Sequence, residues 1–129
     1  MKLLSGKPEM VLEHSLKNTG QKLIETQMYN HNFFMIDNEP TGPNIYTSFP
    51  YEIKAEGRGF GSIAKTENRA ISYTKELAPG DFVFTAGLQG FGPSPDDYDI
   101  LIQNLKSGAG VQITSDQPLE KFVFWACHT

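Results

Sequence analysis

The sequence contains one cysteine, Cys127, among its 129 residues. An internal disulfide and every Cys-x-x-Cys metal or redox motif are therefore excluded. The sequence also lacks an apolar run long enough for a secretory signal or a membrane-spanning helix. Basic runs are absent, and 15 acidic against 11 basic side chains give a net charge of −4. Neither nucleic acid nor a membrane is expected as a partner, and a cytoplasmic location is the default expectation, with any upstream signal left open.

Metal-ligand spacing is absent as well. His14, His31 and His128 are too scattered to form the His-x-His or Cys/His patterns that metal sites use. The glycine-rich runs at 57–61 and 87–92 lack the Gly-Lys-Ser/Thr and the following helix of a phosphate loop, so both are interpreted as loops. We therefore predict neither a metal nor a cofactor.

Turn residues and β-branched or aromatic residues alternate along the chain. Apolar alternation from Met10 to Leu16, a turn at 18–21 and a long run from Leu23 to about Ile36 indicate two strands. The prolines and glycines between Asp37 and Arg69 predict turns and short strands. Further strands are expected at Ile45–Phe49, Ala70–Thr74, Asp81–Thr85, Tyr98–Gln103, Gly110–Thr114 and Lys121–Ala126, with a hairpin turn at Ser107–Gly110. This pattern predicts an all-β fold, an antiparallel β-sandwich forming a single domain over residues 1–129.

The predicted strand from Leu23 to Ile36 has one polar and aromatic face. If the strand is regular, this face carries Glu25, Gln27, Tyr29, His31 and Phe33. Hydrogen-bonding groups beside flat rings suit a sugar, which has hydroxyls and an apolar C–H face. The alternative is a solvated outer face of an antiparallel sheet. Trp125 is a further candidate for stacking on a sugar, with an ordinary core position as the alternative.

Two short motifs carry a resemblance to a known family. Leu16-Lys17-Asn18-Thr19-Gly20, followed after nine residues by Asn30-His31-Asn32-Phe33-Phe34, resembles the Asn-Thr-Gly turn and Asn-His-x-Tyr/Phe-Phe pattern of the galactose mutarotase-like (aldose 1-epimerase) family. Later segments are similar to that family in the same order, namely 98–102, 107–108, 114–118 and 122–125. The resemblance spans roughly Glu9 to Thr129.

The resemblance implies a site and a mechanism. His31 matches the histidine that acts as general acid on the ring oxygen of the sugar, and a pKa near 6.5 suits a histidine to this role. Asp99 matches an aspartate that hydrogen-bonds sugar hydroxyls, and Asn30 lies in the histidine motif. With Gln27, Tyr29, Phe33 and Trp125, these residues form the expected substrate site for an aldose, free or phosphorylated.

The same resemblance implies that the catalytic base is missing. In the family a glutamate follows the strand that resembles Phe122–Ala126, and no such residue occurs before Thr129. Glu25 and Glu120 match the base neither in order nor in position. We therefore expect either a central-to-C-terminal part of a mutarotase-like supersandwich or a reduced relative that keeps the fold without the full site. In both cases we expect the 129 residues to be inactive alone.

Three hypotheses remain open. The first is an isomerase of the aldose 1-epimerase type, acting without a cofactor. The second is a β-sandwich module that binds carbohydrate without turning it over. The third is an interaction fragment whose open strand edges pair with a second copy to form a homodimer.

Overall fold

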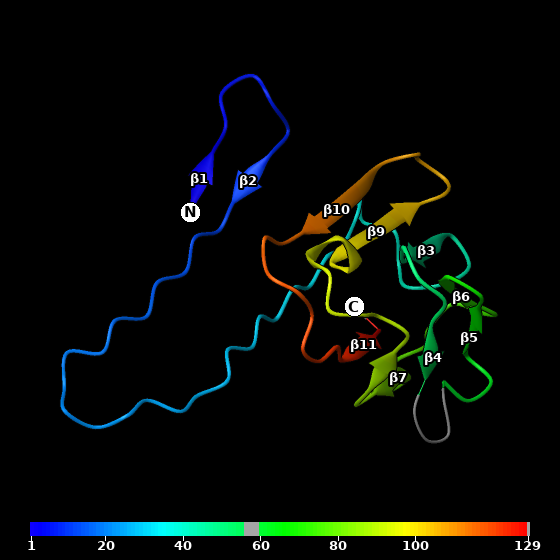
Figure 1. Cartoon of the computed structure of the whole chain (residues 1–129). Coiled ribbons are helices and arrows are strands. Elements are labelled where there is room, and N and C mark those ends of the chain that lie inside the picture. The colour runs from blue at the N-terminus through cyan, green and yellow to red at the C-terminus, as the bar shows by residue number, and fades with distance from the viewer. Residues whose placement is uncertain (56–59, 129) are drawn as a thin grey trace. The chain divides into compact units, whose positions relative to one another are not determined.

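A computed structural model describes residues 1–55 and 60–128. Most of the glycine-rich run at 57–61 lies outside the described residues. The chain divides into two compact units, Met1–Asn32 and Phe33–Thr129 (Figure 1). The single domain expected over residues 1–129 stays a prediction.

The first unit is one small hairpin followed by chain without regular structure. Strand β1 (Lys2–Leu3) pairs antiparallel with β2 (Met10–Val11). The backbone N–H of Leu4 donates to the carbonyl of Glu9 at 3.1 Å. Asn18 closes the predicted turn, because its Nδ2 donates to the carbonyl of Lys22 at 2.8 Å and its Oδ1 accepts from the N–H of Gly20. Every residue from 1 to 32 is exposed, so this unit has no core of its own.

The prediction of a strand over Leu23–Ile36 is wrong. No described residue from 12 to 44 belongs to a strand, and the strand expected over Met10–Leu16 is limited to β2. A strand needs a neighbour to satisfy its backbone groups and a core in which to bury one face. Residues 23–35 are all exposed, so neither face is buried, and the alternation of residue types has no structural counterpart.

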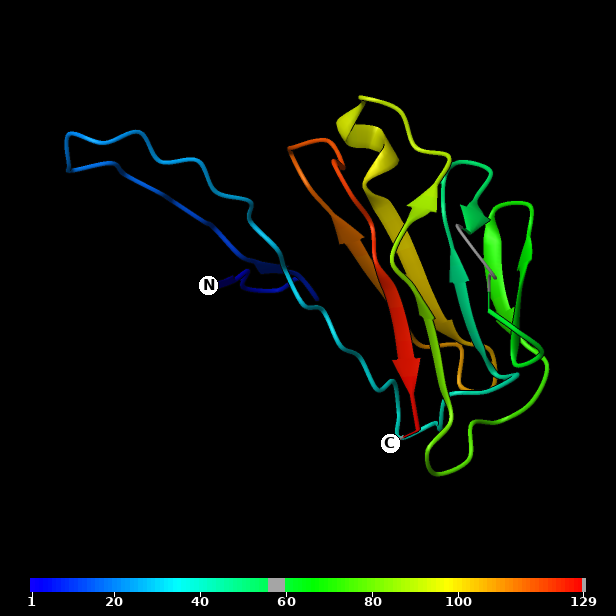
Figure 2. The same ribbon diagram turned by 90° about the horizontal axis from the view of Figure 1, so that it is seen from below.

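The described residues of the second unit contain the hydrophobic core and three antiparallel sheets. Its largest sheet has the order β10-β9-β3-β6-β5, and β11 pairs with β7 and β4 with β8. The strands are β3 (Ile45–Ser48), β4 (Lys54–Ala55), β5 (Ala64–Glu67), β6 (Ala70–Tyr73), β7 (Phe82–Thr85), β8 (Leu88–Gln89), β9 (Asp99–Asn104), β10 (Gly110–Thr114) and β11 (Phe124–Cys127). Figure 2 shows the longer strands running along a roughly common direction.

The described residues contain no α-helix, only a 3-10 turn at Pro95–Asp97. None of their helices could span a membrane. The all-β, antiparallel class is confirmed, and the sandwich arrangement stays a prediction.

Alternation within each strand explains how the core forms. In β7, Val83 and Thr85 are buried while Phe82 and Phe84 are exposed. All three sheets contribute side chains to the core, which comprises Phe49, Tyr51, Ile53, Phe60, Ala64, Ile71, Tyr73, Leu77, Val83, Leu88, Ile100 and Leu119. Since burial of apolar surface is the main stabilising term in folding, the stability of the chain resides in this unit.

Two turns hold the large sheet in register. Asn68 adopts a positive φ of 50° between β5 and β6, a conformation that asparagine tolerates better than most residues. The predicted hairpin turn at Ser107–Gly110 joins β9 to β10, with Gly108 at a φ of 77°. Asn104, buried at the end of β9, accepts at Oδ1 from the N–H groups of Lys106 and Ser107 and donates from Nδ2 to the carbonyl of Ile36.

Candidate functional site

The candidate general acid, His31, lies in the exposed segment at the end of the first unit. Its ring contacts that of Tyr29 edge-to-face, with ring centroids 4.3 Å apart and an interplanar angle of 73°. The two residues are separated by one position, so an extended backbone places both side chains on the same side. Gln27 and Asn30 are exposed in the same segment. The sequence therefore predicted correctly that Tyr29 and His31 lie side by side, although the strand expected over these residues is absent.

Phe33 and Trp125 form a second aromatic pair, within the second unit. Their ring centroids are 5.4 Å apart and their planes lie at 81°, an edge-to-face geometry that aromatic rings favour. Both side chains are exposed, Trp125 from the outer side of β11. Of the two alternatives for Trp125, the core position is wrong because Trp125 alternates with the inward-facing side chains of β11. Its role in binding sugar stays a prediction.

Asp99 begins β9 and is held by the neighbouring strand. Gln112 of β10 donates from Nε2 to Asp99 Oδ1 at 2.7 Å. Oδ2 of Asp99 makes no hydrogen bond within the described part of the chain, so it can accept one from a ligand hydroxyl. The hydrogen-bond partner of Asp99 is thus Gln112, which is not one of the predicted site residues.

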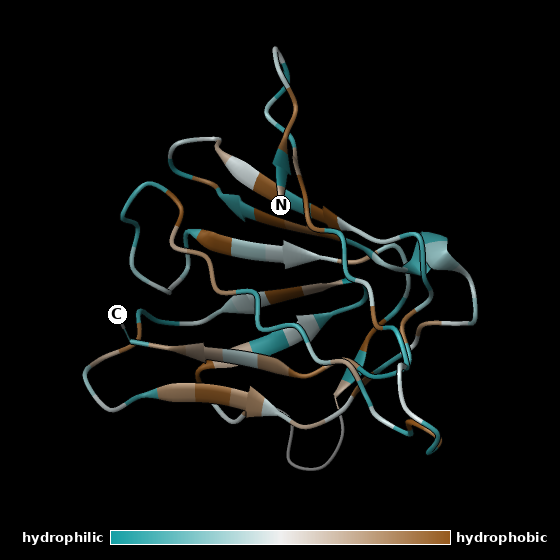
Figure 3. Cartoon of the chain, turned by 90° about the vertical axis from the view of Figure 1, so that its left-hand side faces the viewer, coloured by the Kyte–Doolittle hydropathy of each residue, from teal (hydrophilic) through white to brown (hydrophobic). Residues whose placement is uncertain are grey.

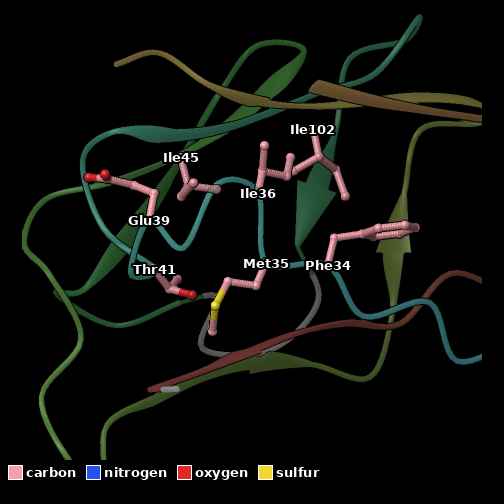
Figure 4. A pocket seen from close by; sticks show the side chains of 7 residues that line it. All are labelled: Phe34, Met35, Ile36, Glu39, Thr41, Ile45 and Ile102. Carbon is pink, nitrogen blue, oxygen red and sulfur yellow. The ribbon is translucent and has the colours of Figure 1, made fainter. Parts of the chain in front are cut away.

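A small cavity within the described part of the second unit has too little volume for a sugar. Figure 4 shows the residues that line it, which are Phe34, Met35, Ile36, Glu39, Thr41, Ile45 and Ile102. Its volume is about 30 Å³, enough for one water molecule, whereas small-molecule sites usually have several hundred Å³. Glu39 at its margin accepts hydrogen bonds from Asn44 and Lys106, which lower the pKa of this carboxyl below its usual value.

A larger, open hollow lies over the outer side of β7 and β11. Its volume is about 760 Å³, and it is lined by Pro79, Gly80, Asp81, Phe82, Phe84, Trp125, Cys127 and His128. Sequence reasoning selected only Trp125 of these residues. The alternation in Asp81–Thr85 placed Phe82 and Phe84 on one face, but phenylalanines on a strand usually face the core, so this face was not recognised as an exposed surface.

Asp81 lies at one end of this hollow. Its Oδ2 accepts from Lys75 Nζ at 2.8 Å and from the backbone N–H of Ala78 at 3.1 Å. The hydrogen bond from Lys75, then that from Ala78, lowers the pKa of Asp81, with a smaller contribution from the nearby His128. The carboxyl is therefore ionised at neutral pH, and its Oδ1 has no hydrogen-bond partner in the described structure.

The described residues contain no group of three or more His, Cys, Asp or Glu side chains positioned to hold a metal ion. The predicted site residues offer imidazole, carboxylate, amide and aromatic groups. No known family model, curated protein or solved structure matches the chain. The resemblance to the mutarotase-like family therefore stays a prediction, carried by sequence motifs such as Asn30–Phe34.

Proposed function

We propose that the chain carries the acid part of an aldose 1-epimerase site, with His31 as the general acid. In the proposed reaction, His31 gives a proton to the ring oxygen of the aldose while a base removes the proton of the anomeric hydroxyl. The C1–O5 bond breaks, the C1–C2 bond rotates, and the reverse proton transfers close the ring as the other anomer. The overall reaction is an isomerisation that consumes no co-reactant.

The observation that carries the proposal is the position of His31. Its imidazole is exposed and lies against the ring of Tyr29, within the motif Asn30–Phe34. The aromatic contact limits the rotation of the imidazole, while exposure lets a sugar approach it. A positioned acid of this kind contributes roughly 10²- to 10⁴-fold to a rate.

No residue of this sequence matches the glutamate that acts as the catalytic base in the mutarotase-like family. Because acid and base act in the same transition state, we expect the 129 residues alone to accelerate anomer interconversion little. A small carboxylate in solution, such as acetate, can take the place of a missing glutamate. The proposal therefore predicts acceleration by protein and acetate together that exceeds the sum of their separate effects.

Polarimetry on freshly dissolved α-galactose and α-glucose tests this proposal. The His31→Ala variant should lose the joint effect with acetate, and His14→Ala is the matched control because His14 is another exposed histidine of the first unit. An equal rate for wild type and His31→Ala, with and without acetate, would contradict the epimerase proposal.

A non-catalytic carbohydrate-binding module is the second candidate function. It is favoured by the exposed pair Phe33 and Trp125, whose rings could cover the C–H face of a sugar. This function predicts saturable binding of sugar with no change in the rate of anomer interconversion, and binding that is unaffected by His31→Ala.

A further inference from the structure

The outer side of the β7–β11 ladder is apolar where the outer side of a sheet is ordinarily polar. Phe82, Phe84 and Trp125 retain 63%, 49% and 48% of their accessible surface. Figure 3 shows both strands coloured mostly brown, β11 being the strand that leads to the C-terminus. Exposure of large aromatic side chains costs free energy, so a cluster of them usually marks a binding surface.

The register of the two strands makes these rings one surface. Phe84 lies directly opposite Trp125, and Phe82 lies opposite Cys127. Opposite side chains on one face are about 5 Å apart at Cβ, and positions i and i+2 along a strand are separated by roughly 6 to 7 Å. The rings therefore form a continuous floor, which we call the aromatic floor: Phe82, Phe84 and Trp125.

Polar groups lie at one end of this floor. Asp81 and His128 line the same hollow, and Oδ1 of Asp81 is left without a partner in the described structure although Oδ2 accepts two hydrogen bonds. The backbone N–H of His128 donates to the carbonyl of Asp81 at 3.4 Å, which ties the two residues together. A floor of rings with a carboxylate oxygen at its end matches a molecule that has an apolar face and hydroxyl groups at its edge.

The size of the floor argues against a second copy as its occupant. Three aromatic side chains that are about half exposed offer roughly 300 Å², while a stable protein interface needs about 800 Å² on each partner. The hollow is within the range that holds small ligands. We propose that the aromatic floor and Asp81 form a saccharide-binding surface, in which a pyranose stacks on Trp125 and Phe84 and a hydroxyl donates to Asp81. The ligand class rests on the proposed function, and Trp125 is shared with the carbohydrate-binding alternative, whereas the surface includes neither His31 nor Tyr29 of the epimerase proposal.

Trp125 is the only tryptophan in the sequence, so its fluorescence reports directly on this surface. The probes are methyl β-galactopyranoside and cellotetraose. The methyl group prevents ring opening, so the first probe can bind but cannot be turned over. We expect both to cause a saturable change in emission, weakened about tenfold by Phe84→Ala and retained in Phe84→Tyr. Leu105→Ala, which removes an exposed apolar side chain elsewhere, is the matched control and should not change binding.

The outcomes separate this inference from the epimerase proposal. Saturable binding that persists in His31→Ala and is weakened in Phe84→Ala supports the surface even if polarimetry detects no catalysis. Anomer interconversion that depends on His31, without any sugar-dependent change at Trp125, overturns the surface and leaves the epimerase proposal standing. Sugar binding unchanged by Phe82→Ala and Phe84→Ala together also overturns it. So does a sugar-independent dimer in analytical ultracentrifugation that Phe84→Ala dissociates, because the floor would then serve a second copy.

Discussion

The two units of the chain differ in where their free energy comes from. Residues 1–32 are all exposed and are held by one two-residue strand pair, local turns and the ion pairs of Lys2 with Glu13 and Lys7 with Glu9. An exposed ion pair contributes less than about 1 kcal/mol. The unit Phe33–Thr129 has a core drawn from three sheets. Stability therefore belongs to the second unit, whereas the candidate acid His31 belongs to the first.

This difference indicates how function and stability are distributed. A substitution in the first unit can change chemistry with little effect on folding, since no core depends on it. A substitution in the second unit acts first on folding, unless it falls on an outward-facing side chain such as Phe84. Matched pairs of variants, one in each unit, test this separation.

The largest effect is expected from removing a core side chain. Ile71 in β6 is fully buried, so Ile71→Ala should lower the free energy of unfolding by about 2 to 5 kcal/mol. Leu23→Ala in the first unit removes a side chain that is 82% exposed and should change it by less than about 0.5 kcal/mol. Urea unfolding followed by Trp125 fluorescence measures both. Similar losses for the two variants would mean that the first unit shares the core.

A second comparison uses two glycines with positive φ. Gly90 (φ 123°) approaches the backbone so closely that a Cβ there would overlap the carbonyl oxygen of Glu52, while Gly6 (φ 76°) faces open space. Gly90→Ala combines backbone strain with overpacking and should cost roughly 2 to 4 kcal/mol. Gly6→Ala adds strain of about 1 kcal/mol, confined to the first hairpin. The same urea titration checks them, and equal midpoints for the two variants would contradict the comparison.

Most long strands of the second unit could be predicted from the sequence. The expected strands at 45–49, 70–74, 81–85, 98–103, 110–114 and 121–126 correspond to β3, β6, β7, β9, β10 and β11, with ends shifted by up to three residues. Their alternation coincides with real burial, as in β7. Strands β4 and β8 could not be predicted, because each has two residues and exists only through its pairing with the other, far along the chain.

The strand prediction failed where alternating residue types do not face a hydrophobic core. Residues 23–36 alternate as a strand would, yet no ladder forms and only Ile36 is buried. For the predicted site residues of this segment, the sequence predicted one contact. Tyr29 and His31 lie against each other because they are two positions apart in the chain. Phe82 and Phe84 were missed because their exposure is a tertiary property, decided by which side of β7 the core occupies.

Tyr51 offers a small effect at neutral pH and the clearest dependence on pH. It is 7% exposed, and its hydroxyl has no hydrogen-bond partner in the described structure. An unpaired buried hydroxyl costs free energy, so Tyr51→Phe should raise the free energy of unfolding at pH 7 by about 1 kcal/mol. Burial, and secondarily the charge of Asp97, raises the pKa of Tyr51 to about 12.

The direction of the pH effect follows from this raised pKa. The unfolded chain ionises Tyr51 near pH 10, while the folded chain keeps Tyr51 protonated up to about pH 12. The free energy of unfolding is therefore unaffected by this group below pH 10 and falls as pH rises from 10 toward 12. Tyr51 should account for roughly 2 to 3 kcal/mol of that loss. Burial also raises the pKa of Tyr73, so a residual fall is expected in Tyr51→Phe. Urea unfolding between pH 9 and 11 compares the slopes: a shallower slope in Tyr51→Phe is expected, and identical slopes would mean that the hydroxyl of Tyr51 is solvated in the folded protein.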